Sequence, residues 1–513
     1  MKRYILFSLL LTIFGCIDDG GNYDYAPTRE LQVIEMKSTN ILTVGESVIL
    51  SPKAIVKKDP LKIQIEGVKF EWLINYKVVA ETETFTFTAE SDGDYYGQLR
   101  MTDPLTGAIS LFDFSITVKS PFETGYAILS EENGKAQLSF IRAKWLGQPD
   151  TIIYEGEYKD IYKQLNEGED LQGLPISISE HWKYDNGLQN GELTLLTGNE
   201  SEVYAQELNG TSLKRETYIQ QEFENGMPAG CRPKQIIHTD WDSFLLDESG
   251  DVYIRRSNSL EGFHTGFFSD KIKLWNGRKF ERLIFTNYSI SNVIFGLERN
   301  PETGKNNWVG IYSDYWRADN NLQELAITGE HSEDFYDFED EILFTDTRND
   351  VNWSGDLSIV YKSKAGEYFL HCINIDRVSR SACRIGESIK INLGKELKIT
   401  GVNGMCTNKK NNYTYLCDDH TIYWVENYYS EDYGEMKTFE KKISTIATNT
   451  RYNGNYGKQL VSMAIAFEDG SVEIWEIKPN ATAFLGRVFT SEHSYGKIKQ
   501  VLGKIGNSGY FFE

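Results

Sequence analysis

A strand-turn-strand motif recurs seven times between residue 120 and the end of the 513-residue chain, at intervals of roughly fifty to sixty residues. Each motif consists of two short strands rich in apolar residues on either side of a short turn, and no helical periodicity separates the repeats. The strands pair 125–129 with 137–140, 192–196 with 202–205, 243–246 with 251–254, 292–295 with 308–312, 356–361 with 367–370, 413–416 with 421–424, and 463–467 with 471–475.

The turns within several motifs contain a glycine, as tight hairpins require, at Gly250, Gly366 and Gly470. Antiparallel repeats of this length are typical of a β-propeller, in which each blade must stack on its neighbours to bury both faces. We therefore predict a propeller of about seven blades over residues 120–513. The strands expected at 498–502 and 509–512 are placed to complete the first blade and close the ring.

Residues 27–119 have a different sequence pattern, with about six short strands separated by turn residues. The stretch Thr84–Thr88 alternates strictly between threonine and phenylalanine, and Trp72 lies within another apolar strand. This pattern predicts an immunoglobulin-like sandwich that acts as a spacer, with Trp72 in its core. The fold class is therefore all-β, a small sandwich followed by a propeller.

The N-terminus has the organisation of a lipoprotein signal peptide. Basic residues at positions 2 and 3 precede an apolar run, Tyr4–Phe14, that is too short to span a bilayer, and Gly15 precedes Cys16. We expect residues 1–15 to be removed and Cys16 to be lipidated, with residues 16–26 as a polar, flexible tether. The alternative is an ordinary secreted protein in which Cys16 forms a disulfide.

The residues after Cys16 carry a resemblance to a known family. Asp18-Asp19 and the stretch Gly21–Tyr25 resemble the start of the PKD-like family lipoproteins of Bacteroidetes-type bacteria, and residues 27–119 look like the PKD-like domain. The resemblance implies a lipid-anchored protein of the outer membrane that faces the cell exterior. It also implies association with a TonB-dependent nutrient importer, made of a SusC-like channel and a SusD-like lipoprotein.

Charge and composition exclude one large class of partner. The chain carries a formal net charge of −22, so it repels polyanions and we expect no binding to nucleic acid. No segment after residue 25 is apolar for long enough to cross a bilayer, which leaves the lipid as the expected anchor.

The cysteines leave two possibilities open. Cys372 and Cys383 are eleven residues apart, as are Cys406 and Cys417, and each pair could form a disulfide across a hairpin; the other possibility is five buried thiols, Cys231 included.

The histidines are scattered, without the spacing of a zinc site, and we expect no metal and no cofactor. The acidic run 333–341 is interpreted as a solvated loop, with calcium binding as the less favoured alternative.

Catalytic motifs are missing from the sequence. It contains neither G-x-S-x-G nor H-E-x-x-H, so we do not expect an enzyme, although propeller enzymes use scattered residues that no motif reveals.

Aromatic residues before the second strand of five blades suggest a binding surface instead. Alternating strand direction would place all of these segments on one face of the ring. An aromatic ring stacks on a sugar or peptide, and polar neighbours orient it. The predicted ligand-binding residues are Trp182, Tyr184, Asp240, Trp241, Tyr288, Arg348, Trp353, Arg451 and Tyr456. The alternative is that these rings pack between blades.

Three functions follow as hypotheses. The first is a substrate-binding accessory of the importer, which takes oligopeptides or oligosaccharides. The second is an extracellular propeller hydrolase or lyase that acts on glycans, and the third is a purely structural importer subunit.

Overall fold

The computed structural model describes residues 29–145, 152–185, 188–239, 242–256, 267–268, 278–285, 292–313, 322–349, 355–379, 381–395, 405–408, 413–426, 432–449 and 461–504. The chain divides into two compact units, Met1–Ser120 and Pro121–Glu513. Each unit has its own hydrophobic core.

The first unit is a sandwich of short strands. A five-stranded sheet with the order β2-β9-β8-β5-β6 forms one layer, and the pairs β1-β4 and β3-β7 lie opposite it. The strands are β1 (Leu31–Ile34), β2 (Thr39–Thr43), β3 (Ser47–Leu50), β4 (Lys53–Val56), β5 (Lys69–Ile74), β6 (Lys77–Ala80), β7 (Phe85–Thr88), β8 (Gly93–Thr102) and β9 (Ile109–Lys119). The described unit thus has more strands than the six or so predicted, because several strands are only four residues long.

Trp72 lies at the centre of the sandwich, as predicted. Its side chain is fully buried, packs on Phe85 and Phe114, and donates a hydrogen bond from Nε1 to the carbonyl oxygen of Thr82 at 2.8 Å. A buried indole N–H needs such a partner, so the ring fills the core without leaving an unpaired polar group.

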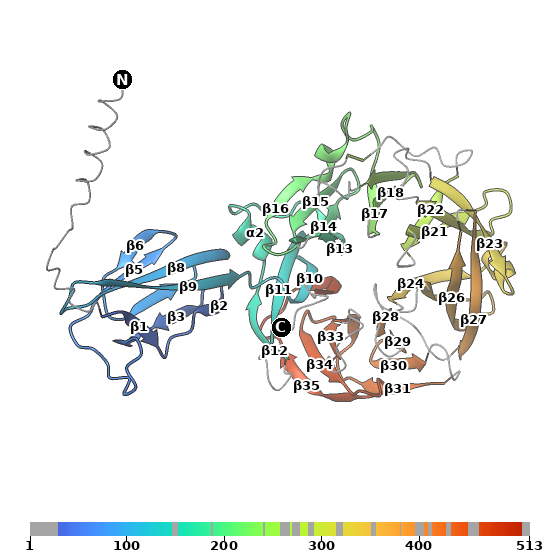
Figure 1. Ribbon diagram of the computed structural model, residues 1–513. Helices are drawn as coiled ribbons and strands as arrows, with labels where there is room; N and C mark the ends of the chain where they lie inside the picture. Colours follow the sequence, from blue (N-terminus) through green and yellow to red (C-terminus); the bar gives the residue numbers. More distant parts are fainter. Residues whose placement is uncertain are drawn as a thin grey trace, which may run out of the picture. The chain divides into compact units, whose positions relative to one another are not determined.

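In the part of the chain that the structure describes, the second unit forms seven blades in a ring (Figure 1). In order from the inner to the outer strand, the blades are β36 (Lys497–Lys504), β10 (Gly125–Glu132), β11 (Lys135–Trp145) and β12 (Ile152–Tyr158); β13 (Leu174–Asp185), β14 (Leu188–Gly198), β15 (Val203–Asn209) and β16 (Arg215–Tyr218); β17 (Pro233–His238), β18 (Asp242–Asp247) and β19 (Val252–Arg256); β20 (Phe280–Phe285), β21 (Asn292–Arg299), β22 (Asn306–Ser313) and β23 (Leu322–Gly329); β24 (Glu341–Asn349), β25 (Gly355–Lys362), β26 (Tyr368–Val378) and β27 (Ala382–Gly394); β28 (Met405–Asn408), β29 (Tyr413–Cys417), β30 (Thr421–Glu426) and β31 (Tyr433–Thr438); and β32 (Ile443–Thr448), β33 (Val461–Phe467), β34 (Val472–Ile477) and β35 (Phe484–Thr490). Among the described residues, the short helices are α2 (Ile161–Leu165), η1 (Ile219–Glu222) and η3 (Ser332–Phe335).

The predicted propeller is confirmed, and so is its blade number. Each of the seven predicted hairpins forms the second and third strands of a blade, and the inner strands pack on one another around the whole ring, from β36 through β13, β17, β20, β24, β28 and β32 back to β36. The turn glycines Gly250, Gly366 and Gly470 adopt φ values of 83°, 80° and 81°, in the left-handed region that favours glycine.

The ring is closed by pairing the C-terminal strand with the first strand of the propeller unit. β36 pairs with β10 in antiparallel register, from Gly125 opposite Lys504 to Glu131 opposite Lys497. The predicted strand at 498–502 thus completes the first blade; the second one, at 509–512, lies outside the described residues.

Glutamine side chains join neighbouring inner strands across blade boundaries. Gln500 accepts a hydrogen bond from the amide of Ile178 at 3.0 Å and donates one to its carbonyl oxygen at 2.9 Å, which links β36 to β13. Gln235 makes the same pair of bonds with Leu283, at 3.0 and 2.9 Å, and links β17 to β20. The side-chain amide of glutamine offers one donor and one acceptor, as does the backbone of one residue. These bonds therefore satisfy the N–H and C=O groups of Ile178 and Leu283 where adjacent sheets diverge.

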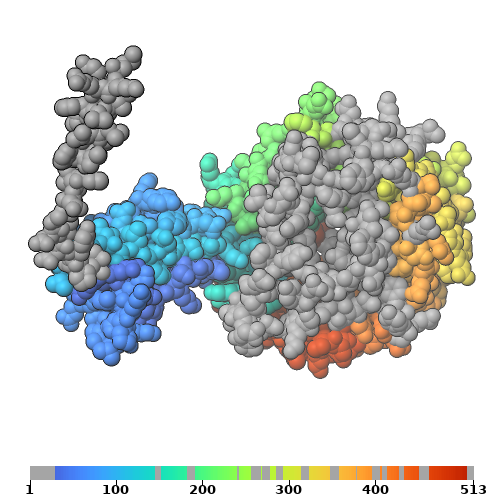
Figure 2. Space-filling view, viewed as in Figure 1, coloured from blue at the N-terminus to red at the C-terminus, as the bar shows by residue number. Residues whose placement is uncertain are grey.

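Blades four and five join at their outer edges. β23 pairs with β27 in parallel, so that these two blades form one eight-stranded sheet, and their surfaces adjoin in yellow and orange at the rim of the ring (Figure 2).

The acidic run 333–341 lies beside blades four and five and is not simply a solvated loop. Phe335 is buried in the core shared by the two blades, and Phe338 packs against this core. These aromatic side chains, which alternate with acidic ones, anchor the segment to the propeller.

Of the two possibilities, the structure shows the second: neither candidate disulfide is formed, and all five cysteines of the propeller are buried thiols. Cys372 and Cys383 lie on paired strands but opposite Ile389 and Val378, and they belong to different hydrophobic cores. Cys406 lies opposite Tyr415, so Cys417 is displaced along the ladder. Burial raises the pKa of Cys231, Cys383 and Cys417 to about 12, as expected of inert thiols.

Within the described residues, no helix has the length and hydropathy required to span a bilayer.

Candidate functional site

Six of the nine residues of the predicted aromatic surface are not described by the structure. Asp240, Trp241, Tyr288, Trp353, Arg451 and Tyr456 lie outside the described residues. Trp182 and Tyr184 were predicted to lie in a loop, but this prediction is wrong. They belong to the ladder of β13 and β14, where they lie opposite Gly191 and Gln189. The backbone of Arg348 likewise belongs to β24 and lies opposite Asp356. The inner strands extend further than the sequence pattern indicates, and the ligand-binding role of these nine residues stays a prediction.

A groove of about 810 Å³ lies at the other end of the inner strands, across blades three, four and five. Its walls come from the first residues of β17, β20 and β24 and from the turns that follow β18 and β21. The lining residues are Lys234, Gln235, Glu248, Ser249, Gly250, Lys279, Phe280, Glu281, Arg282, Leu297, Arg299, Gly304, Asn306, Glu339, Asp340, Glu341 and Ile342. Its volume lies within the range of small-molecule and oligomer sites.

The groove carries charges of both signs, and several are already neutralised. Glu248 forms an ion pair with Arg232 at 2.7 Å, and Lys279 and Glu339 pair with Asp251 and Lys364. Burial raises the pKa of Asp340.

Arg282 is different from these paired groups. Its guanidinium makes a hydrogen bond to the carbonyl oxygen of Leu343 at 3.4 Å, and no carboxylate of the described residues lies within ion-pair distance of it. Burial lowers the pKa of Arg282, with Glu281 as a weaker opposing influence. A partly desolvated cation of this kind favours an anionic or strongly accepting ligand group.

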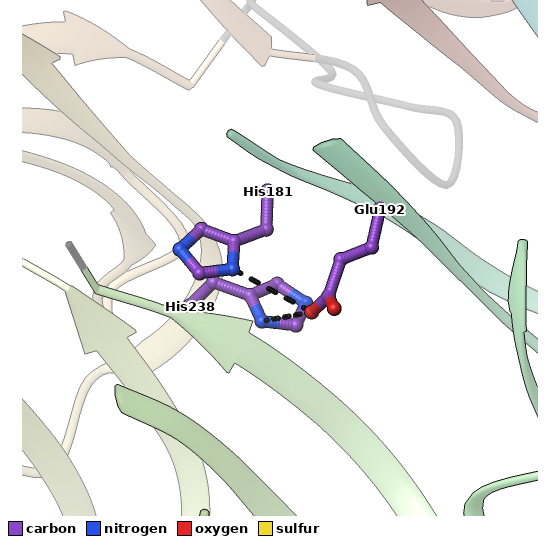
Figure 3. A group of neighbouring side chains, drawn as sticks. All are labelled: His181, Glu192 and His238. Carbon is purple, nitrogen blue, oxygen red and sulfur yellow. Dashed lines mark ion pairs between the residues drawn. The ribbon is translucent and has the colours of Figure 1, made fainter. Parts of the chain in front are cut away.

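A second candidate site is a buried cluster between blades two and three. His181 on β13 lies opposite Glu192 on β14, and His238 ends β17 on the next blade. The two imidazole rings are stacked, with centroids 4.7 Å apart and planes 7° from parallel, and both direct Nδ1 toward Oε1 of Glu192, at 3.5 and 3.4 Å (Figure 3).

Arg255 on β19 completes this cluster. Its guanidinium contacts Oε1 of Glu192 at 3.0 Å and Oε1 of Glu207 at 2.7 Å, and it also pairs with Glu222. It lies over the ring of Phe268, with Cζ 5.1 Å from the centroid. Three carboxylates thus converge on one guanidinium, and the group carries more acidic than basic charge.

Hydroxyl groups fix the orientation of His238. Its Nδ1 lies 2.9 Å from Oγ of Ser243 and its Nε2 3.1 Å from Oγ1 of Thr194. Burial, and then the proximity of His181, lowers the pKa of His238 to about 3, so the ring is neutral at physiological pH. Burial alone would raise the pKa of Glu192, but Arg255 and the two neighbouring histidines together outweigh this effect and hold the pKa well below its ordinary value, so this carboxyl is ionised.

Neither site is predicted by the sequence. Metal-site spacing rules look for ligands close together in one segment, whereas His181, Glu192 and His238 lie on three strands of two blades. Comparison of equivalent positions in neighbouring blades could have revealed the cluster. His181 lies opposite the residue that precedes the mostly apolar stretch Leu193–Leu196, and His238 lies opposite the residue that precedes the apolar stretch Phe244–Leu246.

Comparisons with known proteins address the N-terminal region and the fold. The PKD-like family model matches residues 16–175, which agrees with the resemblance noted from the sequence. No curated protein matches the chain.

Solved structures that resemble this one include a quinonprotein alcohol dehydrogenase-like protein from Bacteroides thetaiotaomicron, at 13% identity and a TM-score of 0.42, with coverage of 94% of this chain and 100% of the other. The Cps50 (Swd1) β-propeller domain of Myceliophteria thermophila is 8% identical, with a TM-score of 0.36 and coverage of 70% and 98%. The WD40 domain of SCAP from fission yeast is 9% identical, with a TM-score of 0.35 and coverage of 59% and 64%.

Proposed function

We propose that this protein is a lipid-anchored binding module of the outer cell surface, which captures an extracellular oligomer for a TonB-dependent importer of the SusC/SusD type. The groove across blades three to five carries this proposal, because it offers a sizeable polar concavity on a rigid ring. The signal segment and Cys16 support a surface anchor, and the PKD-like match over residues 16–175 fits a spacer behind that anchor.

The charges of the groove favour a ligand with both carboxylate and hydrogen-bonding groups. Arg282 suits a carboxylate, whereas Glu281 and Glu341 are exposed acceptors for ammonium, amide or hydroxyl donors. Oligopeptides and acidic oligosaccharides share this chemistry, and they are the substrate classes we propose. The proposal is of binding without turnover, so release of shortened peptide or glycan from a mixture with the purified protein would contradict it.

Replacing Arg282 with methionine is expected to weaken the binding of carboxylate-bearing oligomers at least about tenfold, because a charge-assisted hydrogen bond contributes roughly 1.5–3 kcal/mol. The melting temperature should be unchanged or higher, since burial disfavours the charge. The measurement is isothermal titration calorimetry against peptide and uronic-acid oligomer libraries, with the two libraries distinguishing the two substrate classes.

A matched control is Arg487→Met on the outer strand β35, where the arginine pairs with Glu473 at 2.7 Å, away from the groove. The affinity of this control variant for carboxylate-bearing oligomers should equal that of the wild type. The triple variant Trp182→Ala, Trp241→Ala, Trp353→Ala tests the predicted aromatic surface separately. If the triple variant loses binding while Arg282→Met keeps it, the ligand lies on the aromatic face and the groove assignment is wrong.

A further inference from the structure

The buried cluster between blades two and three has an arrangement that packing alone does not require. Glu192 has no exposed surface, and its Oε2 has no hydrogen-bond partner among the described residues. Oε1 of the same carboxylate is the atom that contacts Arg255. A buried carboxylate oxygen without a partner is costly, so Oε2 is the point in the cluster where a cation would be most stabilising.

Two imidazole nitrogens lie beside this carboxylate, with Nδ1 of His181 and Nδ1 of His238 at 3.5 and 3.4 Å from Oε1. One ligand atom from each of His181, Glu192 and His238 lies within 4.8 Å of the other two (Figure 3). In a tetrahedral zinc site with bonds of about 2.0–2.1 Å, ligand atoms are about 3.4 Å apart. Binding of an ion therefore requires side-chain rotations that close the triangle to that size. Because the stacked rings are nearly parallel, at least one must tilt to direct its nitrogen at a shared ion.

We propose that His181, His238 and Oε2 of Glu192 bind a divalent transition metal ion of the zinc type, while Oε1 keeps its contact with Arg255. Two imidazoles and one carboxylate are a donor set that suits zinc, and they leave a fourth position for water. The ion would link the inner strands of blades two and three and offset part of the acidic charge around Arg255. This site is separate from the groove and does not depend on the ligand proposed for it.

The test is metal binding by the mature protein, first stripped with a chelator and then titrated with Zn²⁺ by calorimetry. The wild type should bind one ion more per chain than the variant His181→Asn, and Zn²⁺ should raise its melting temperature by about 5 °C or more, because the ion binds only the folded state. His371→Asn is the matched control, since His371 is also a buried histidine, bonded to Ser388 at 2.7 Å on blade five. This control should bind as much Zn²⁺ as the wild type.

Equal Zn²⁺ stoichiometry and equal thermal shift in the wild type and His181→Asn would overturn the proposal. If His181→Asn does not fold, Co²⁺ bound to the wild type decides the matter. A visible absorption band of tetrahedral intensity supports a site of nitrogen and oxygen ligands inside the protein, and the weak spectrum of hydrated Co²⁺ contradicts it.

Discussion

The variant Arg255→Met is expected to lose about 3–5 kcal/mol of folding stability, the cost of removing one partner from a buried ion group. Arg255 is 5% exposed and contacts Glu192, Glu207 and Glu222. Methionine fills a similar length of side chain but leaves these carboxylates to repel one another in a medium of low polarity. Urea denaturation followed by tryptophan fluorescence measures the loss.

The control for this prediction is an arginine that also faces two carboxylates but is more exposed. Arg278 pairs with Glu298 at 2.7 Å and Glu324 at 3.2 Å, and its side chain is 32% exposed. Arg278→Met should cost no more than about 1 kcal/mol, as is usual for ion pairs near the surface. Similar stabilities for the two variants would show that the carboxylates around Arg255 are protonated or otherwise compensated in the folded protein.

A chain that ends at Gly496 is expected to lose the cooperative unfolding transition of the propeller, because it lacks β36. This strand pairs along β10 and buries Ile498 and Val501. It also carries Lys504, whose fully buried ammonium pairs with Glu180 at 3.1 Å on the next blade. Removing these contacts costs more than about 5 kcal/mol, as much as the whole stability of many domains. Calorimetry measures the transition.

Adding the missing strand back serves as the control for truncation. A peptide of residues 497–513 should bind the truncated chain and restore the transition, since its partner strand β10 is present. A truncated chain that unfolds like the full one without the peptide would mean that ring closure contributes little to stability.

The sequence predicted the parts of the fold that depend on local alternation. Each hairpin of the propeller is a short-range pattern, several have a turn glycine, as at Gly250 and Gly470, and all seven are confirmed. The disulfides were less predictable. An eleven-residue spacing fits a hairpin, but the register places Cys372 and Cys383 opposite other residues and in separate cores.

The candidate sites could not be predicted because they depend on distances between blades. His181 and His238 meet only when two inner strands pack side by side, and Arg282 is partly buried only because β24 lies next to β20. The aromatic residues were easier to notice and harder to place. A tryptophan in a sequence signals a large contact surface, but strand length decides whether it belongs to a loop, and β13 includes Trp182 in its ladder.

The central claim is that the protein is a surface module that binds an oligomer for an importer. The most direct measurement is purification of the tagged native protein from its own outer membrane in mild detergent, followed by mass spectrometry of co-purified proteins and bound small molecules. The account predicts a TonB-dependent channel and its SusD-like lipoprotein, with peptide or glycan attached to the wild type and lost from Arg282→Met. Recovery of the protein alone, with no channel and no oligomer, would contradict it.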